Sequence, residues 1–562
     1  MSQTTPHPNL VPRRPVPPCL AMTLALLLPW ATAAGLPPRL PDDAAVRDAL
    51  RARVEHLRLD PGQRVHGDRV LAPRVVATFF EGRAFAPAWS GGDRVAQALA
   101  AIRGVEEDGL TPAHYHLAAI ERARDGVARG GGPAAVAELD ILVADALAAV
   151  LDHVRFGKVR PASLDPNWNV DPRLAAPPLE TLLEFVAEAP SVTAGLERFA
   201  PTHFVYTGLK QALARYRAIA ASGGWATVPP GPTLKPGVTD PRVASLRARL
   251  AATGELPASA ASESPVFEAD VETAVKLFQE SHRLTPDGAV GRGTLEALNV
   301  DARATAAQVR VNLERARWVL PGLRDTFVLV NLPAFKAYFI RERRNVWETR
   351  TQIGQTARKT RSFRADLTYL VLNPDWTVPP TILAQDVLDP MRRGEDAIRR
   401  KGLQVIDRQG RRVDPAQIDW ATARPSTFPY TLRQAPGRDN ALGRVKFIFP
   451  NEHSIFLHDT PSRELFAADR RTFSSGCIRL EHALDFARLL LEDLPEWPAE
   501  RFDQAVASDE TRTVFLPEPI PVLIVYWTAS VGASGDVRFA RDVYGLDPAL
   551  LRALDAPPEP AR

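Results

Sequence analysis

Cysteine is nearly absent from this sequence, because the 562 residues contain only Cys19 and Cys477. Cys19 precedes an apolar N-terminal run, so cleavage of that run as a leader would leave Cys477 alone. A single cysteine excludes an internal disulfide framework. Cys477 is therefore a buried structural side chain, an intermolecular link or a reactive group.

An excess of charge of one sign is also missing. The 69 Lys and Arg residues nearly balance the 66 Asp and Glu residues, giving a net charge of +3. This small positive charge gives no reason to expect nucleic acid as a partner.

Long apolar runs are missing after the N-terminus. The apolar run at 20–30 follows Arg13 and Arg14 and precedes the small residues of 31–35, which is the pattern of a secretory signal. A run of about 10 residues is short for a bilayer span. We predict that residues 1–34 are a signal peptide, and the alternative is an uncleaved anchor.

The length predicts three or four structural units. Apolar residues recur at helical spacing through residues 40–222, for example in "VAELDILVADALAAVLDHVRFGKV", so this region is predicted to be a helical scaffold domain. His114 and His116 suggest a metal, but an isolated pair of histidines is more often part of an ordinary loop.

A Gly/Pro-rich linker leads into a compact unit at 232–300. Its pattern predicts helix, loop, helix, turn and helix, with Asp270 capping the helix that contains Val275 and Phe278. The stretch "AVKLFQ…DGAVGRGTLEALN" resembles the small three-helix peptidoglycan-binding module. The alternative is a generic helical hairpin. By the resemblance, its groove binds glycan or only positions the next domain.

Residues 305–530 contain short β-rich runs such as "FVLVNLP" and "SIFLHD", which predict a strand-dominated domain. A more polar, helix-rich insertion at 380–430 is predicted to be a cap subdomain over it. Residues 531–562 are predicted to be a C-terminal tail, and a final hairpin is predicted to turn near Gly532 to Gly535. The predicted fold class is therefore multidomain α+β.

The candidate chemistry lies in "SIFLHD" and "SSGCIRL". Alternation along a strand places Phe456 and His458 on one face. Gly476 permits unusual torsions before Cys477, and backbone N–H groups at this turn are candidates for an oxyanion hole. The amphipathic segment that follows suggests that a helix N-terminus favours the Cys477 thiolate, with His458 transferring the proton.

Three other interpretations of these residues compete. Cys477 is inert in the core, or it joins His453, His458 and His482 in a zinc site, or it belongs to a cysteine protease. The last interpretation needs an Asn or Asp that orients His458, and spacing identifies none.

The segment 450–491 resembles the active-site region of the L,D-transpeptidases, which has a His-x-Thr strand followed by Ser-x-Gly-Cys-x-Arg. "ERARWVLP", "NPDWTVPP" and "APGRDNALGRVKF" resemble the large periplasmic members of Gram-negative bacteria. One departure is Arg361, where relatives tend to have proline. The matching positions are His458, Thr460, Ser475, Gly476, Cys477 and Arg479.

The resemblance implies that Cys477 is the nucleophile and His458 the base, with the imidazole oriented by a backbone carbonyl. Arg479 either binds a substrate carboxylate or holds the loop by hydrogen bonds, and the loop role is favoured. Candidate substrate contacts are Phe456, Thr460, Asn440 and Trp376, the last of which is equally suited to a core role. No metal or organic cofactor is implied.

Three functions are consistent with these residues. The first is a periplasmic L,D-transpeptidase that forms 3→3 cross-links between stem peptides through a cysteine acyl-enzyme. The second is hydrolysis of stem peptides, or release of wall-attached proteins, at the same site. The third is a wall-binding scaffold without activity. The expected partners are peptidoglycan stem peptides and glycan, and other cell-wall synthesis enzymes are further candidates.

Overall fold

The computed structural model describes residues 43–60, 62–532 and 534–560. The predicted signal peptide at 1–34 therefore lies outside the described residues. None of the helices within these ranges combines the length and the apolarity needed to cross a bilayer.

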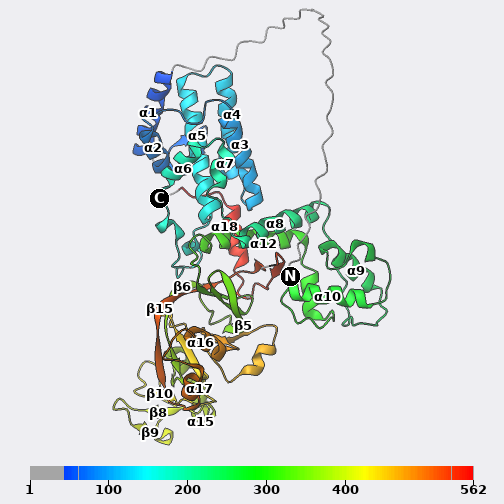
Figure 1. Cartoon of the computed structure of the whole chain (residues 1–562), viewed down its shortest axis with the longest axis vertical. Helices are drawn as coiled ribbons and strands as arrows, with labels where there is room; N and C mark the ends of the chain where they lie inside the picture. Colours follow the sequence, from blue (N-terminus) through cyan, green and yellow to red (C-terminus); the bar gives the residue numbers. More distant parts are fainter. Residues whose placement is uncertain (1–42, 61, 533, 561–562) are drawn as a thin grey trace, which may run out of the picture. The chain divides into compact units, whose positions relative to one another are not determined.

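The scaffold region is a helical bundle built around one apolar helix, α5 (Pro133–Phe156), which is buried on almost every side. Figure 1 shows the neighbouring helices gathered around it in blue and cyan. Two buried carboxylates on α5, Asp140 and Asp145, accept backbone N–H groups from the loops at Ala88–Ser90 and Leu71–Ala72. The other elements are α1 (Asp43–Leu59), β1 (Arg64–Val65), β2 (Asp68–Arg69), α2 (Pro73–Gly82), α3 (Arg94–Gly104), α4 (Leu117–Ala128), α6 (Leu179–Glu188), α7 (Val192–Glu197) and α8 (Phe204–Ala221).

His116 takes part in this bundle as a structural residue. Its ring contacts Asp145 at 2.7 Å and Asp68 at 3.0 Å, so two carboxylates occupy both ring nitrogens. His114 lies in a separate contact with Lys158 at 2.9 Å.

The small module has three helices, α9 (Arg242–Thr253), α10 (Ala269–Ser281) and α11 (Arg292–Leu298), around an apolar core of its own. Gln279 donates to Ala289 O and accepts from Gly288 N, which fixes the turn between α10 and α11. The prediction that Asp270 caps α10 is wrong. Glu268 holds the cap position, and Asp270 lies in the first turn, where its carboxylate pairs with Arg247.

The β-rich domain follows helix α12 (Ala302–Val319) and contains a nine-stranded sheet in the order β13-β5-β14-β12-β11-β6-β15-β3-β4. Strand β4 also pairs with β5, so eight of the strands form a closed ring. Helix α16 (Ala483–Leu491) buries Phe486 against this sheet, and α17 (Ala499–Ala507) follows it. The strands are β3 (Phe327–Asn331), β4 (Lys336–Arg341), β5 (Arg344–Gly354), β6 (Phe363–Leu372), β11 (Val445–Ile448), β12 (Leu457–His458), β13 (Thr472–Ser474), β14 (Ile478–Leu480) and β15 (Arg512–Val525).

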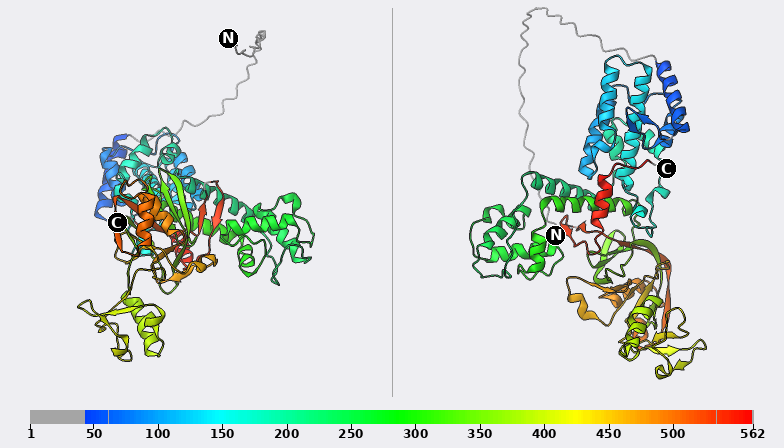
Figure 2. Two further views of the ribbon diagram at one scale, coloured as in Figure 1. Left: turned by 60° about the horizontal axis from the view of Figure 1, so that its bottom comes forward. Right: turned by 180° about the vertical axis from the view of Figure 1, so that it is seen from behind.

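The insertion has its own small core and is less helical than the sequence suggests. It is the yellow-green lobe of short elements in Figure 2. A four-stranded sheet in the order β7-β10-β8-β9 accompanies its helices, and strands of two to four residues are too short to show a clear period. Its elements are β7 (Trp376–Thr377), α13 (Pro380–Ile382), a π-helix (Leu383–Leu388), α14 (Asp389–Arg392), α15 (Ala397–Arg400), β8 (Gln404–Ile406), β9 (Arg412–Val413) and β10 (Thr431–Gln434).

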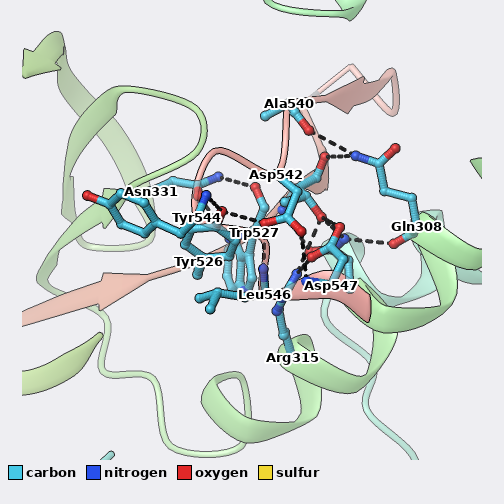
Figure 3. Close-up of polar contacts among 12 residues, drawn as sticks. Gln308, Arg315, Asn331, Tyr526, Trp527, Ala540, Asp542, Tyr544, Leu546 and Asp547 are labelled. Carbon is cyan, nitrogen blue, oxygen red and sulfur yellow. Dashed lines mark hydrogen bonds and ion pairs between the residues drawn. The ribbon is translucent and has the colours of Figure 1, made fainter. Parts of the chain in front are cut away.

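The C-terminal segment contains the predicted hairpin, β16 (Ala529–Val531) and β17 (Val537–Phe539), followed by α18 (Asp547–Asp555). It is packed and not loose, since Leu550 and Leu554 belong to the same apolar core as the scaffold helices. Asp547 forms an ion pair with Arg315 of α12 (Figure 3). It also accepts a hydrogen bond from Thr528.

Candidate active site

The candidate site is built on two adjacent parallel strands, β12 and β14. Leu457 pairs with Ile478, and His458 pairs with Arg479. Because side chains alternate along a strand, Phe456, His458, Cys477 and Arg479 share one face of this strand pair. Cys477 lies two residues before Arg479, which is the residue paired with His458. The thiol and the imidazole are therefore diagonal neighbours across the two strands.

His458 is buried, with 4% of its surface exposed. Its Nδ1 lies 2.5 Å from the carbonyl oxygen of Asp459. A carbonyl only accepts, so Nδ1 carries the proton and Nε2 is left as a base. Burial lowers the pKa of His458 to about 3, and the charges of Arg479 and Lys446 act in the same direction. The imidazole is therefore neutral at physiological pH.

The Asp459 carbonyl is itself held in place by the turn beneath it. The Asp459 carboxylate accepts from Arg444 N at 2.9 Å and from Arg463 at 2.8 Å. Gly443 lies against this carboxylate at φ +61°, where a Cβ would come within 2.4 Å of the Asp459 side chain. The orienter that spacing did not identify is thus a main-chain carbonyl, as the family resemblance implies.

Cys477 is partly exposed and lies at the end of a tight turn. Burial raises the pKa of the Cys477 thiol, while a hydrogen bond from the Phe456 N–H and the charge of Arg479 act to lower it. The prediction of a thiolate favoured by a helix N-terminus is wrong. The strand β14 intervenes, and α16 begins only at Ala483, beyond the single turn over which the dipole acts.

The turn before Cys477 depends on Gly476, whose φ of +125° favours glycine. The Gly476 N–H donates to Ser474 Oγ at 3.1 Å, and Ser474 Oγ donates to the Cys477 carbonyl at 2.5 Å. Of the two amides predicted for the oxyanion hole, the Gly476 N–H is therefore already used. The Cys477 N–H remains as the candidate donor. Ser475 is exposed, and its Oγ accepts from Arg358 at 2.7 Å.

Arg479 lies on β14 and contacts the neighbouring strand β5. Its guanidinium donates to Gln352 at 3.1 Å, on β5 and not on the loop, and its buried Nε has no hydrogen-bond partner. Gln352 in turn donates to Ser462 O at 3.1 Å, in the loop between His458 and Cys477. The unpartnered Nε leaves donor capacity on the face that Arg479 shares with Cys477 and His458.

The other predicted substrate contacts divide by position. The Phe456 ring lies 5.6 Å from the His458 ring, between the site and the sheet core. Thr460 is buried, and its Oγ1 accepts from Ser462 N. Asn440 is buried and donates its amide within its own loop, to Ala435 O and Gln434 O. Trp376 lies on β7 and packs against the core of the insertion.

Residues that the sequence analysis missed connect the turn to the rest of the chain. Arg358 joins Ser475 to the insertion, because its guanidinium also binds both carboxylate oxygens of Asp386 at 2.9 Å. Thr360 donates from Oγ1 to the Gly476 carbonyl at 2.8 Å. Arg358 and Thr360 belong to the stretch "RKTRSF", whose departure from the family pattern at Arg361 falls on an exposed position.

The histidines of the competing zinc interpretation are placed in other contacts. The ring of His453 packs edge-on against Phe363, at 5.1 Å between centroids. His482 faces Asp485 at 3.4 Å. Within the described ranges, no group of three or more His, Cys, Asp or Glu side chains is arranged to hold a metal ion.

Three family models match separate parts of the chain. Residues 325–507 match "L,D-transpeptidase catalytic domain", residues 239–298 match "Putative peptidoglycan binding domain", and residues 74–213 match "Scaffold domain". The chain therefore contains an L,D-transpeptidase catalytic domain together with a peptidoglycan-binding module.

Among curated proteins, the chain resembles the "Putative L,D-transpeptidase" of Haemophilus influenzae. The two are 35% identical over 240 residues, which is 43% of this chain and 48% of the relative. The chain thus spans about half the length of this relative.

Two solved structures of L,D-transpeptidases are also similar. The structure from Stackebrandtia nassauensis is 10% identical, covers 53% of this chain and 96% of its own, and has a TM-score of 0.20. The structure from Xylanimonas cellulosilytica is 15% identical, covers 53% of this chain and 100% of its own, and has a TM-score of 0.16.

Proposed function

We propose that this protein is a peptidoglycan L,D-transpeptidase that forms 3→3 cross-links through a thioester on Cys477. The observation that carries the proposal is the neutral His458, whose Nδ1 is held by the Asp459 carbonyl, on the same strand face as Cys477. This arrangement occurs within a domain that matches the L,D-transpeptidase catalytic model.

In the first step, His458 Nε2 accepts the thiol proton as Cys477 Sγ attacks a carbonyl carbon. The carbonyl belongs to the L-centre of diaminopimelate in a tetrapeptide stem. The developing oxyanion accepts a hydrogen bond from the Cys477 N–H. The C–N bond to the terminal D-Ala then breaks, and the proton on His458 passes to the leaving amine.

In the second step, the side-chain amine of a neighbouring diaminopimelate attacks the thioester. His458 accepts a proton from this amine, the new amide forms as the thioester C–S bond breaks, and His458 returns the proton to Cys477 Sγ. Water competes with the amine at this point. The insertion, which Arg358 connects to the Ser475 turn, is suited to limit the access of water.

Arg479 is proposed to bind a substrate carboxylate, because its buried Nε lacks a partner. The site of action is proposed to be the periplasm, in line with the predicted signal peptide. The peptidoglycan-binding module would hold the chain near its substrate, and other cell-wall synthesis enzymes remain candidate partners.

The test uses the purified chain, a disaccharide-tetrapeptide substrate and mass spectrometry of the products. A transpeptidase yields a 3→3 dimer and free D-Ala, and Cys477→Ser yields neither. Tripeptide without dimer would instead show hydrolysis at the same site. Unchanged substrate, together with no Cys477 adduct after incubation with a carbapenem, would contradict catalysis altogether.

A further inference from the structure

Tyr544 of the C-terminal segment contacts the loop beside the candidate site, and Figure 3 shows it next to Tyr526 and Asp542. Tyr544 lies outside the range that matches the catalytic domain model. Its hydroxyl donates to Gly354 O at 2.7 Å and accepts from Thr360 N at 3.2 Å. One phenol therefore bridges the two ends of the loop that follows β5.

This loop holds the turn that carries Cys477. Gly354 pairs with Ser474 of β13, and Gln355 N donates to Ser474 O at 2.9 Å. Thr360 Oγ1 accepts from Gly354 N at 2.9 Å and donates to Gly476 O at 2.8 Å. Thr360 is thus bonded to Gly354 at the other end of the loop, and Tyr544 contacts both of these residues.

The bond to Gly476 O has a direct consequence for Cys477. The carbonyl of Gly476 and the N–H of Cys477 belong to one planar peptide group and point in opposite directions. Holding the carbonyl fixes the plane, and with it the direction of the Cys477 N–H. This N–H is the candidate oxyanion donor, whose effect depends on being aimed before the reaction begins.

Tyr544 is itself held firmly. Its N–H donates to Tyr526 Oη at 2.7 Å, and Tyr526 donates to Asp542 at 2.6 Å, with the two rings stacked at 5.6 Å (Figure 3). Asp542 accepts from the N–H groups of Leu546 and Asp547 at the start of α18. These bonds hold the backbone of Tyr544 in place next to the start of α18.

We infer that Tyr544 is a positioning residue that, through Thr360, aims the Cys477 N–H at the oxyanion. The inference rests on the proposed function only in requiring acyl transfer to Cys477. It holds whether an amine or water then attacks the thioester.

The test compares two reactions of Cys477 in the full chain. Acylation by a carbapenem passes through an oxyanion, whereas alkylation by iodoacetamide does not. In Tyr544→Phe, which retains the ring, we expect acylation to slow by tenfold or more while alkylation stays within twofold of the original rate. Thr360→Val should behave in the same way, and Thr360→Ser should restore most of the loss.

The matched control is Tyr369→Phe, on β6, whose ring packs against Phe515 away from this loop. It should change neither rate. Acylation within threefold of the original rate in both Tyr544→Phe and Thr360→Val would overturn the inference. A parallel fall in acylation and alkylation would also overturn it, because that result indicates a general loss of structure. Absence of acylation in the unmodified chain would instead refute the proposed function.

Discussion

The resting state of Cys477 and His458 is the sharpest prediction from the site. Burial raises the pKa of the thiol above its ordinary value of 9.0, and burial lowers the pKa of His458 to about 3. Both groups are therefore neutral before substrate binds. A preformed thiolate–imidazolium pair would require the opposite shifts.

The magnitudes follow from these values. A thiol with a pKa of 9.0 is about 3% thiolate at pH 7.5, so the raised pKa of Cys477 sets a smaller fraction. An imidazole with a pKa of about 3 is only about 0.1% protonated at pH 6. The alkylation rate of Cys477 should then rise about tenfold per pH unit between pH 6 and 9, with no plateau at low pH.

The assay is iodoacetamide labelling of the full chain from pH 5 to 9, quantified on the Cys477 peptide by mass spectrometry. Because His458 is neutral, His458→Gln should leave this alkylation profile nearly unchanged and still abolish acylation by a carbapenem. His482→Gln, which changes an exposed histidine beside Asp485, is the matched control and should affect neither reaction.

A rate plateau between pH 5 and 7 that disappears in His458→Gln would refute this reasoning. Such a plateau would show that an ion pair exists in the free enzyme. The geometry of His458, with Nδ1 held by the Asp459 carbonyl, would then have to accommodate a charged ring.

Three further predictions concern the turn, the insertion and acid stability. Gly476→Ala, at φ +125°, should cost about 1–3 kcal/mol in backbone strain and abolish acylation, whereas Gly410→Ala, at φ +79° in the insertion, should lower the melting temperature and leave acylation intact. A double-mutant cycle with Arg358→Ala and Asp386→Ala should give a coupling of roughly 1–3 kcal/mol in the hydrogen-exchange protection of 383–388. The control Arg392→Ala should leave that protection unchanged. Additive effects of Arg358→Ala and Asp386→Ala would contradict the contact. The buried His153 and His282 have folded pKa values of about 4 and about 3, below the ordinary 6.5, so the unfolded chain binds more protons and stability falls as the pH drops below 6.5. His153 and His282 should each lower the free energy of unfolding by about 1.4 kcal/mol at pH 5.5. His282→Gln should therefore reduce the drop in melting temperature between pH 7.5 and 5.5, whereas the control His482→Gln should not.

The parts of the site that could be predicted from the sequence are those that follow from patterns within a single segment. Alternation along one strand places Phe456 and His458 on a shared face, because the period of two needs only neighbouring residues. The same alternation after the turn adds Cys477 and Arg479 to that face. The helices of the scaffold region are equally local, since the apolar spacing in α5 is visible within one segment.

Short elements and distant contacts were not accessible in this way. Strand β14 has three residues, and overlooking it led to the wrong environment for the Cys477 thiol. Arg358 meets Ser475 across 117 residues, and Tyr544 meets Gly354 across 190 residues. No periodic pattern links such pairs, because these loop residues meet only in the tertiary fold.

The functional unit must therefore extend beyond the range that matches the catalytic domain model, which ends at residue 507. Strand β15 begins at Arg512 and lies between β6 and β3 in the interior of the sheet, so a chain ending at 507 would open the ring of strands and expose two edges. Tyr544 lies further on, and its phenol and its carbonyl oxygen both contact the loop after β5. Chemistry concentrated in a few neighbouring residues thus depends, for its geometry, on a segment that the catalytic match leaves out.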